Sequence, residues 1–178
     1  MSIGQGSKKT EGVTFRLEKD TLDSLKSESE NKEISLNTLA NQIFNQHVDF
    51  SATAGKARLI SFPKALLVKV LDKFTEEEIT EIAKMIAQTE MADITYIMRR
   101  KFDLESFLEV VESWVRASGF PYHHNVKDGE HSFVIPHDMS KKWSLYFAKL
   151  FEHTFESLTN KPAKFSVTGN TLVFTVQT

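Results

Sequence analysis

Apolar and polar side chains alternate most clearly near the start of the chain, between Gly12 and Asp20. Val13, Phe15 and Leu17 alternate with polar residues, so an extended backbone places these three apolar side chains on one face of a strand. A single strand leaves both edges and one apolar face uncovered, and it therefore needs a second strand beside it. The residues that follow show helical spacing instead. We expect the strand to pair antiparallel with its counterpart in a second copy of the chain, about a two-fold axis.

Two helices are expected after this strand. The first is predicted over about 20–31, with the Asp20 side chain as its N-cap. Its inner positions, at helical spacing, are Leu22, Leu25 and Ser29. After a short break, Ser35 is a favourable N-cap for a second helix that ends near Phe50. The inner face of the second helix is expected to carry Leu36, Leu39, Ala40, Ile43, Phe44 and Val48.

A strand, a helix, a turn and a Ser-capped helix thus follow one another over about residues 13–50. In this region the chain resembles the ribbon-helix-helix (MetJ/Arc-type) family of DNA-binding dimers. The matching residues are Val13-Thr14-Phe15-Arg16-Leu17, the pair Leu22 and Leu25, and Ile34-Ser35-Leu36-Asn37-Thr38-Leu39. The resemblance implies a domain over 11–50 that dimerises and binds DNA.

The resemblance also implies which residues contact bases. In the family the paired strands enter the major groove, and their outward residues touch base edges. Here those residues are Gly12, Thr14 and Arg16. Arginine can donate two hydrogen bonds to guanine, and threonine offers a hydroxyl and a methyl group, so both side chains suit this role.

Contacts to DNA phosphates are implied at the start of the second helix. The family seats the N-terminus of this helix on a phosphate, which corresponds here to the amides of Leu36 and Asn37 with help from Ser35. Free helix amides and the positive end of the helix dipole explain the preference. Lys8 and Lys9, on the arm before the strand, are further candidates for phosphate contacts.

Glu33 and the charge balance differ from what the resemblance suggests. The family usually places Gly at the position of Glu33, where the first helix ends, so either Glu33 adopts a costly left-handed conformation or the turn has another shape. Residues 8–50 carry six Lys and Arg against eight Asp and Glu, a net charge of −2. Non-specific affinity should be weak, and binding should depend on where single cations such as Arg16 lie.

The middle of the chain is expected to be a linker followed by helices. Small residues without periodicity open a linker over 51–62. Pro63 suits the first turn of one helix, and Thr75-Glu76-Glu77-Glu78 is a capping box that opens the next. Together they predict a helical connector over 63–102. Its basic end, Arg99-Arg100-Lys101, is expected to interact with water and the helix dipole rather than with nucleic acid.

Residues 103–178 repeat the order helix, strand, strand twice. Asp103 caps the first helix, Asp128-Gly129 marks the turn of the first hairpin, and Ser140 starts the second helix. The expected strands are 122–126, 131–135, 164–168 and 171–176. We therefore expect an α+β fold for the whole chain, in which this last domain is one antiparallel four-stranded sheet with both helices on one face.

Six histidines raise the question of a metal site. His131 and His137 would lie about 20 Å apart on one strand at ~3.3 Å per residue, and His123 and His124 point to opposite faces. Around a two-residue turn, His124 and His131 are diagonal neighbours on one face, but no third ligand is visible. We expect no metal and no other cofactor, with a site completed in a dimer as the alternative.

Composition argues against several other classes of protein. The chain has 178 residues, a net charge of −2 and no cysteine, which predicts a soluble, cytoplasmic protein without disulfides. No apolar run approaches ~18 residues, so no membrane span is expected. The polar, Gly-rich residues 1–10 predict a disordered arm. No phosphate-binding Gly-rich loop, His-Glu-x-x-His or Gly-x-Ser-x-Gly occurs, so we expect no enzyme.

These patterns predict a homodimeric, sequence-specific DNA-binding transcriptional regulator of prokaryotic type. Its C-terminal domain would add a dimer contact or act as a sensor. The aromatic residues Trp143, Phe147, Phe151 and Phe155 are expected to be core, with a pocket for an apolar effector as the alternative. Two other functions remain open: an antitoxin-type regulator that binds a toxin through its second part, and an interaction scaffold whose first domain only dimerises.

Overall fold

The computed structural model describes residues 10–178, so nearly all of the expected N-terminal arm lies outside the described residues. Its internal contacts divide the chain into two compact units, residues 1–43 and residues 44–178. The boundary falls inside the predicted domain over 11–50. The whole is an α+β fold, as predicted.

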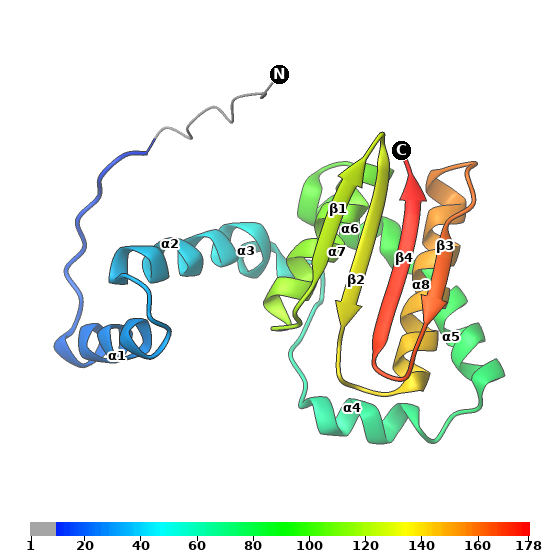
Figure 1. The fold of residues 1–178 in the computed structure, drawn as a ribbon, viewed down its shortest axis with the longest axis horizontal. Helices are drawn as coiled ribbons and strands as arrows, with labels where there is room; N and C mark the ends of the chain where they lie inside the picture. Colours follow the sequence, from blue (N-terminus) through cyan, green and yellow to red (C-terminus); the bar gives the residue numbers. More distant parts are fainter. Residues whose placement is uncertain (1–9) are drawn as a thin grey trace. The chain divides into compact units, whose positions relative to one another are not determined.

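Unit 1 contains a segment without regular structure, helix α1 and most of helix α2 (Figure 1). Residues 10–18 form neither helix nor strand in the single copy. Helix α1 spans Lys19–Asn31, and helix α2 begins at Leu36 and ends at Gln46. The predicted cap of α1 is wrong, because Asp20 lies in the first turn and Glu18 occupies the N-cap position without a side-chain hydrogen bond. The helix therefore begins one residue earlier than predicted.

The predicted inner face of the second helix is only partly covered. Leu39 is 1% exposed, and Leu36 and Ala40 are partly buried. The more C-terminal apolar positions are exposed, with Ile43 at 40% and Val48 at 71%. The predicted helical spacing is therefore confirmed. In a single copy, however, only the N-terminal positions of the predicted inner face are buried.

The predicted linker over 51–62 begins as helix. Beyond α2 the chain continues as a π-helical turn, His47–Ser51, and a short helix α3, Ala52–Ala54. The two alanines of α3 favour helix, which explains why small residues here do not mark a break. Ala57 then packs in a small core with Met98 and Val110, so this segment is part of unit 2.

Five longer helices follow in unit 2. They are α4 Lys64–Leu71, α5 Glu76–Thr89, α6 Met91–Arg99, α7 Leu104–Ala117 and α8 Lys141–Leu158. The predicted capping box is confirmed: Thr75 Oγ1 accepts from the Glu78 amide at 3.2 Å, and the Glu78 carboxylate accepts from the Thr75 amide at 2.7 Å. Asp103 caps α7 as predicted, by accepting from the Ser106 amide at 2.9 Å. Ser140 precedes α8, but its side chain makes no cap bond.

The predicted antiparallel sheet is confirmed. Its strands are β1 His123–Lys127, β2 Glu130–Pro136, β3 Lys164–Val167 and β4 Thr171–Gln177, in the order β1-β2-β4-β3. Asp128 and Gly129 have φ of 52° and 77°, and Lys127 pairs with Glu130 across them. Two consecutive positive φ values give the tight hairpin that an Asp-Gly turn predicts.

Helices α7 and α8 lie on one face of the sheet, as Figure 1 shows. The core between them is aromatic: the ring of Phe107 meets Phe151 and Phe155 edge-on at 5.7 and 5.5 Å, and Phe155 contacts Phe174 of β4 at 5.6 Å. Helix α5 packs along α8 and adds Ala83 to the same core. The predicted connector over 63–102 is therefore built into unit 2. Among the described residues, none of the helices combines the length and apolarity required to cross a bilayer.

Candidate nucleic-acid interface

The residues predicted to contact bases lie in the segment before α1. Gly12, Thr14 and Arg16 are all exposed. The alternating apolar positions are exposed as well, with Val13 at 70% and Leu17 at 49%. A strand needs hydrogen bonds to a neighbouring strand, and the structure contains one copy of the chain only. Pairing of this segment with its counterpart in a second copy therefore stays a prediction.

The turn between α1 and α2 has the shape that a glycine would normally provide. Glu33 has φ of 54°, so of the two alternatives the left-handed conformation is the one adopted. The Glu33 amide donates to the Glu30 carbonyl at 3.0 Å, and the Ile34 amide donates back to the Ser29 carbonyl at 3.0 Å. This pair of bonds closes the C-terminal end of α1 in the manner of a Schellman motif. Glu33 adopts a conformation that costs a residue with a Cβ about 1–2 kcal/mol.

Ser35 begins α2 as predicted. Its hydroxyl oxygen accepts a hydrogen bond from the Thr38 amide at 3.0 Å, which satisfies the third amide of the helix. Within residues 10–178, the amides of Leu36 and Asn37 have no hydrogen-bond acceptor. These two amides are therefore available to an anion at the positive end of the α2 dipole.

The charged residues around this helix start are mixed. Lys32 forms an ion pair with Glu28 at 2.6 Å, and Glu33 is exposed at the turn itself. A phosphate here would lie close to acidic as well as basic side chains, which weakens its attraction. The predicted phosphate contacts Lys8 and Lys9 lie outside the described residues.

The basic triplet at the end of α6 contacts carboxylates and carbonyls of unit 2, rather than only water and the helix dipole as predicted. Arg99 pairs with the Glu109 carboxylate at 3.0 Å and donates to the Asp49 carbonyl at 3.1 Å. Lys101 pairs with Asp103. Arg100 is the left-handed C-cap of α6, with φ of 62°. Two of the three cations are thus already neutralised by carboxylates.

A second cluster of polar side chains lies between α7 and the first hairpin of unit 2. His124 Nε2 is 3.0 Å from His131 Nδ1, which confirms the predicted diagonal pair. His124 Nδ1 is 2.7 Å from a carboxylate oxygen of Glu112. A carboxylate only accepts hydrogen bonds, so His124 donates to Glu112 through Nδ1. Its Nε2 and the Nδ1 of His131 share one further hydrogen bond. Sequence reasoning missed Glu112, because nothing local relates α7 to the hairpin.

The expected absence of a metal stays a prediction for this cluster, in which His124 contacts both Glu112 and His131. Nowhere in residues 10–178 do three His, Cys, Asp or Glu side chains come together in a way that would hold a metal. Burial and the neighbouring imidazole of His124 lower the pKa of His131 from its ordinary value of 6.5.

Comparison with known proteins finds no matching family model, curated protein or solved structure. Function is therefore inferred from the residues and the geometry of this chain alone.

Replacing Glu33 by glycine should stabilise unit 1. Glycine adopts positive φ without a Cβ clash, and the relief of about 1–2 kcal/mol should exceed the added chain entropy of about 0.4–1 kcal/mol. Thermal unfolding followed by circular dichroism would measure the gain. Glu33→Ala is the matched control, because it removes the carboxylate but keeps the Cβ. Equal effects of Glu33→Gly and Glu33→Ala would mean that charge, not backbone conformation, limits the stability of this turn.

The His131 pKa predicts a pH dependence of stability. A histidine whose pKa is lower in the folded state contributes its full stability above its unfolded value, and this stability is lost as the pH falls below about 6.5. His131→Asn should therefore flatten the dependence of the unfolding free energy on pH between neutrality and mild acid. The slope of the unfolding free energy against pH should differ between the two proteins by at most about 1.4 kcal/mol per pH unit, the value for one proton. Urea unfolding at several pH values measures it, and parallel curves for the two proteins would contradict the assignment.

Proposed function

We propose that this protein is a homodimeric, sequence-specific DNA-binding regulator whose residues 11–50 form a ribbon-helix-helix domain. One observation carries the proposal. An exposed alternating segment precedes a helix, a left-handed turn at Glu33 and a helix capped by Ser35. That order of elements matches the ribbon-helix-helix arrangement, in which two paired strands contact the bases. The two unsatisfied amides at the start of α2 match its phosphate contact.

Dimerisation follows from the exposure of the apolar positions. Fully burying a side chain such as Val13 or Leu17 is worth about 1.5–3 kcal/mol. Two antiparallel strands would bury such side chains from both copies and also pair the backbone groups of residues 13–17. The sum for Val13 and Leu17 of both copies is at most about 6–12 kcal/mol. The cost of association is about 4–15 kcal/mol, so side-chain burial brings the dimer near balance and the paired backbone groups add to it.

DNA reading follows from the other face of the same strands. When Val13 and Leu17 turn into the dimer, Thr14 and Arg16 turn out, because side chains alternate along a strand. The paired strands fit the major groove, where Arg16 can contact guanine with two hydrogen bonds. The amides of Leu36 and Asn37 would hold a backbone phosphate and so fix the register of the dimer on the duplex.

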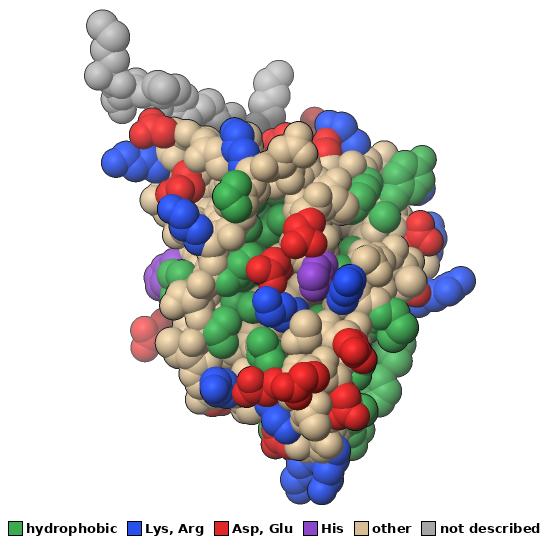
Figure 2. Space-filling view, turned by 90° about the vertical axis from the view of Figure 1, so that its right-hand side faces the viewer, with side chains coloured by type: hydrophobic (Ala, Val, Ile, Leu, Met, Phe, Trp, Pro, Cys, Tyr) green, Lys and Arg blue, Asp and Glu red, His purple; other side chains and the backbone are tan. Residues whose placement is uncertain are grey.

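The charge of the protein favours specific over non-specific binding. Figure 2 shows basic and acidic side chains interspersed on the drawn face of unit 2, so a broad electrostatic surface for DNA is not found on this face. With few cations placed on phosphates, the affinity should depend only weakly on salt, since each neutralised phosphate adds about −0.9 to the slope of log K against log salt. The same balance also fits the alternative of a scaffold that only dimerises.

Selection from a random DNA pool, followed by sequencing, tests the proposal directly. A short palindromic or repeated preference is expected, and the full chain should bind the selected site as an even-numbered oligomer. Arg16→Ala should weaken binding to that site by about 1–3 kcal/mol and relax the base preference at one position. Lys26→Ala, an exposed change in α1, is the control. No enrichment at low salt would leave the dimerisation scaffold as the function.

Substitutions on the two faces of the proposed strand should separate dimerisation from DNA binding. Leu17→Asp places a charge in the proposed dimer core, so the chain should sediment as a monomer or a weakened dimer and lose DNA binding. Thr14→Asp places the same charge on the outward face, so DNA binding should be lost while the dimer persists. Analytical ultracentrifugation with a DNA-binding titration distinguishes them. Identical behaviour of the two variants would contradict the assignment of faces.

A further inference from the structure

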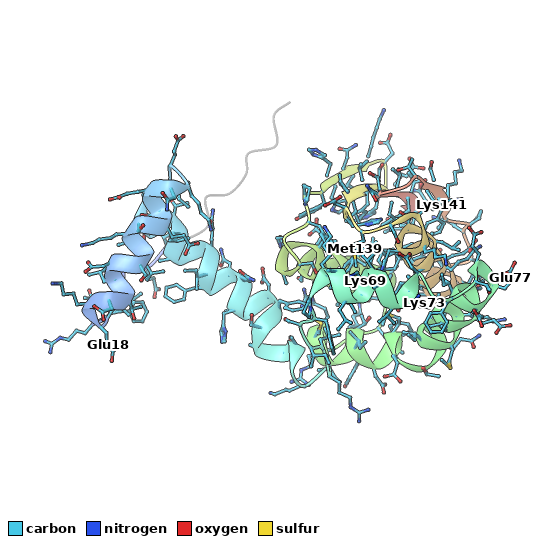
Figure 3. The ribbon with its side chains drawn as sticks, turned by 90° about the horizontal axis from the view of Figure 1, so that it is seen from below. Glu18, Lys69, Lys73, Glu77, Met139 and Lys141 are labelled. Atoms are coloured by element: carbon cyan, nitrogen blue, oxygen red, sulfur yellow. The ribbon has the colours of Figure 1, made fainter. Side chains whose placement is uncertain are left out.

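Unit 2 contains a cavity that the DNA-binding proposal does not use. It has a volume of about 630 Å³, within the range of pockets that hold small molecules. Its walls come from the segment after α2, from α4, from the C-terminal end of α7 and from the N-terminal end of α8. Met139, in the loop between β2 and α8, also lines it and lies beside α4 in Figure 3.

Aromatic rings form much of the wall. Trp114 and Trp143, the two tryptophans of the chain, both line the cavity. The ring of Phe147 lies between them, with centroids 5.0 Å from Trp114 and 5.3 Å from Trp143. The aromatic residues of α8 that were predicted to be core therefore lie in two places. Trp143 and Phe147 line this cavity, whereas Phe151 and Phe155 lie in the main core. Flat aromatic molecules pack well against such rings, by stacking or edge-on.

The polar groups of the wall indicate the second half of the ligand. Trp143 Nε1 is buried and has no hydrogen-bond partner within the described residues. An N–H that is closed off from solvent does not face the open space of the cavity, so Trp143 presents its ring and not its N–H to a ligand. Lys64 is the one charged side chain among the described residues that line the cavity. Its ammonium contacts Asp138 at 3.0 Å, and both side chains are open to solvent, so this ion pair can be exchanged at little cost.

We propose that this cavity binds an aromatic carboxylate. The ring system would lie among the tryptophan and phenylalanine rings, and the carboxylate would pair with Lys64. Charge favours this class: Lys64 is the one charged side chain among the described residues of the wall, its partner Asp138 lies outside the wall, and a neutral aromatic molecule leaves Lys64 unused. The site lies wholly in unit 2 and does not depend on the DNA-binding proposal.

Calorimetric titration of the full chain with naphthoate tests this proposal, with the uncharged naphthamide as the matched probe. Naphthoate should bind about tenfold more tightly, because a charge-assisted bond is stronger than a neutral one. Binding should also change tryptophan emission, because both tryptophans line the cavity. Absence of binding at millimolar naphthoate, or equal affinity for the two probes, would overturn the proposal.

Two variants assign the contacts. Lys64→Gln should weaken naphthoate binding about tenfold and leave naphthamide binding unchanged. Lys69→Gln, on the same helix α4 and outside the cavity wall, is the matched control (Figure 3). Trp143→Phe puts a smaller ring in the wall and leaves Lys64 in place, so it should weaken both probes to the same extent. Equal losses in Lys64→Gln and Lys69→Gln would overturn the role of Lys64 whether or not Trp143→Phe folds.

Discussion

Exposure of apolar side chains ahead of α1 is the constraint from which the proposed function follows. Val13 and Leu17 are 70% and 49% exposed, at positions that alternate with polar residues. Such side chains are stabilised when another surface covers them, and a strand can be covered on one face without losing the other. Covering by a second copy would leave Thr14 and Arg16 outward. Dimerisation and base contact would thus both depend on the alternation of apolar and polar residues along the strand. Shifting that alternation by one residue would move every side chain to the opposite face and abolish both.

The turn at Glu33 keeps a backbone conformation that suits glycine with a residue that has a Cβ, at a definite cost. A left-handed residue with a Cβ costs about 1–2 kcal/mol, yet the hydrogen bonds from Glu33 and Ile34 close α1 in the usual way. The backbone geometry is therefore kept while the residue changes. What changes with it is charge, since Glu33 brings a carboxylate into the turn three positions before Leu36. A phosphate there must be held by short-range hydrogen bonds rather than by long-range attraction.

Features with a local cause could be predicted from the sequence. The Asp103 cap, the capping box at Thr75 and the Asp128-Gly129 hairpin each depend on a few neighbouring residues, and each is confirmed. The cap at Asp20 failed because several residues near a helix start compete for the N-cap position. The packing of α5 into the main core and the contact of Glu112 with His124 depend on tertiary structure. Periodicity does not contain that information.

The cavity in unit 2 has a similar tertiary origin. Trp114 lies near the end of α7 and Trp143 near the start of α8, so the two rings come together only when the αββ repeats pack. Phe50, in the helical turn that directly follows α2, also lines this cavity. A ligand that fills the cavity would therefore contact the chain segment next to the helix that carries Ser35. Because this link is covalent, the wall of the cavity and α2 stay neighbours along the chain for any arrangement of the two units.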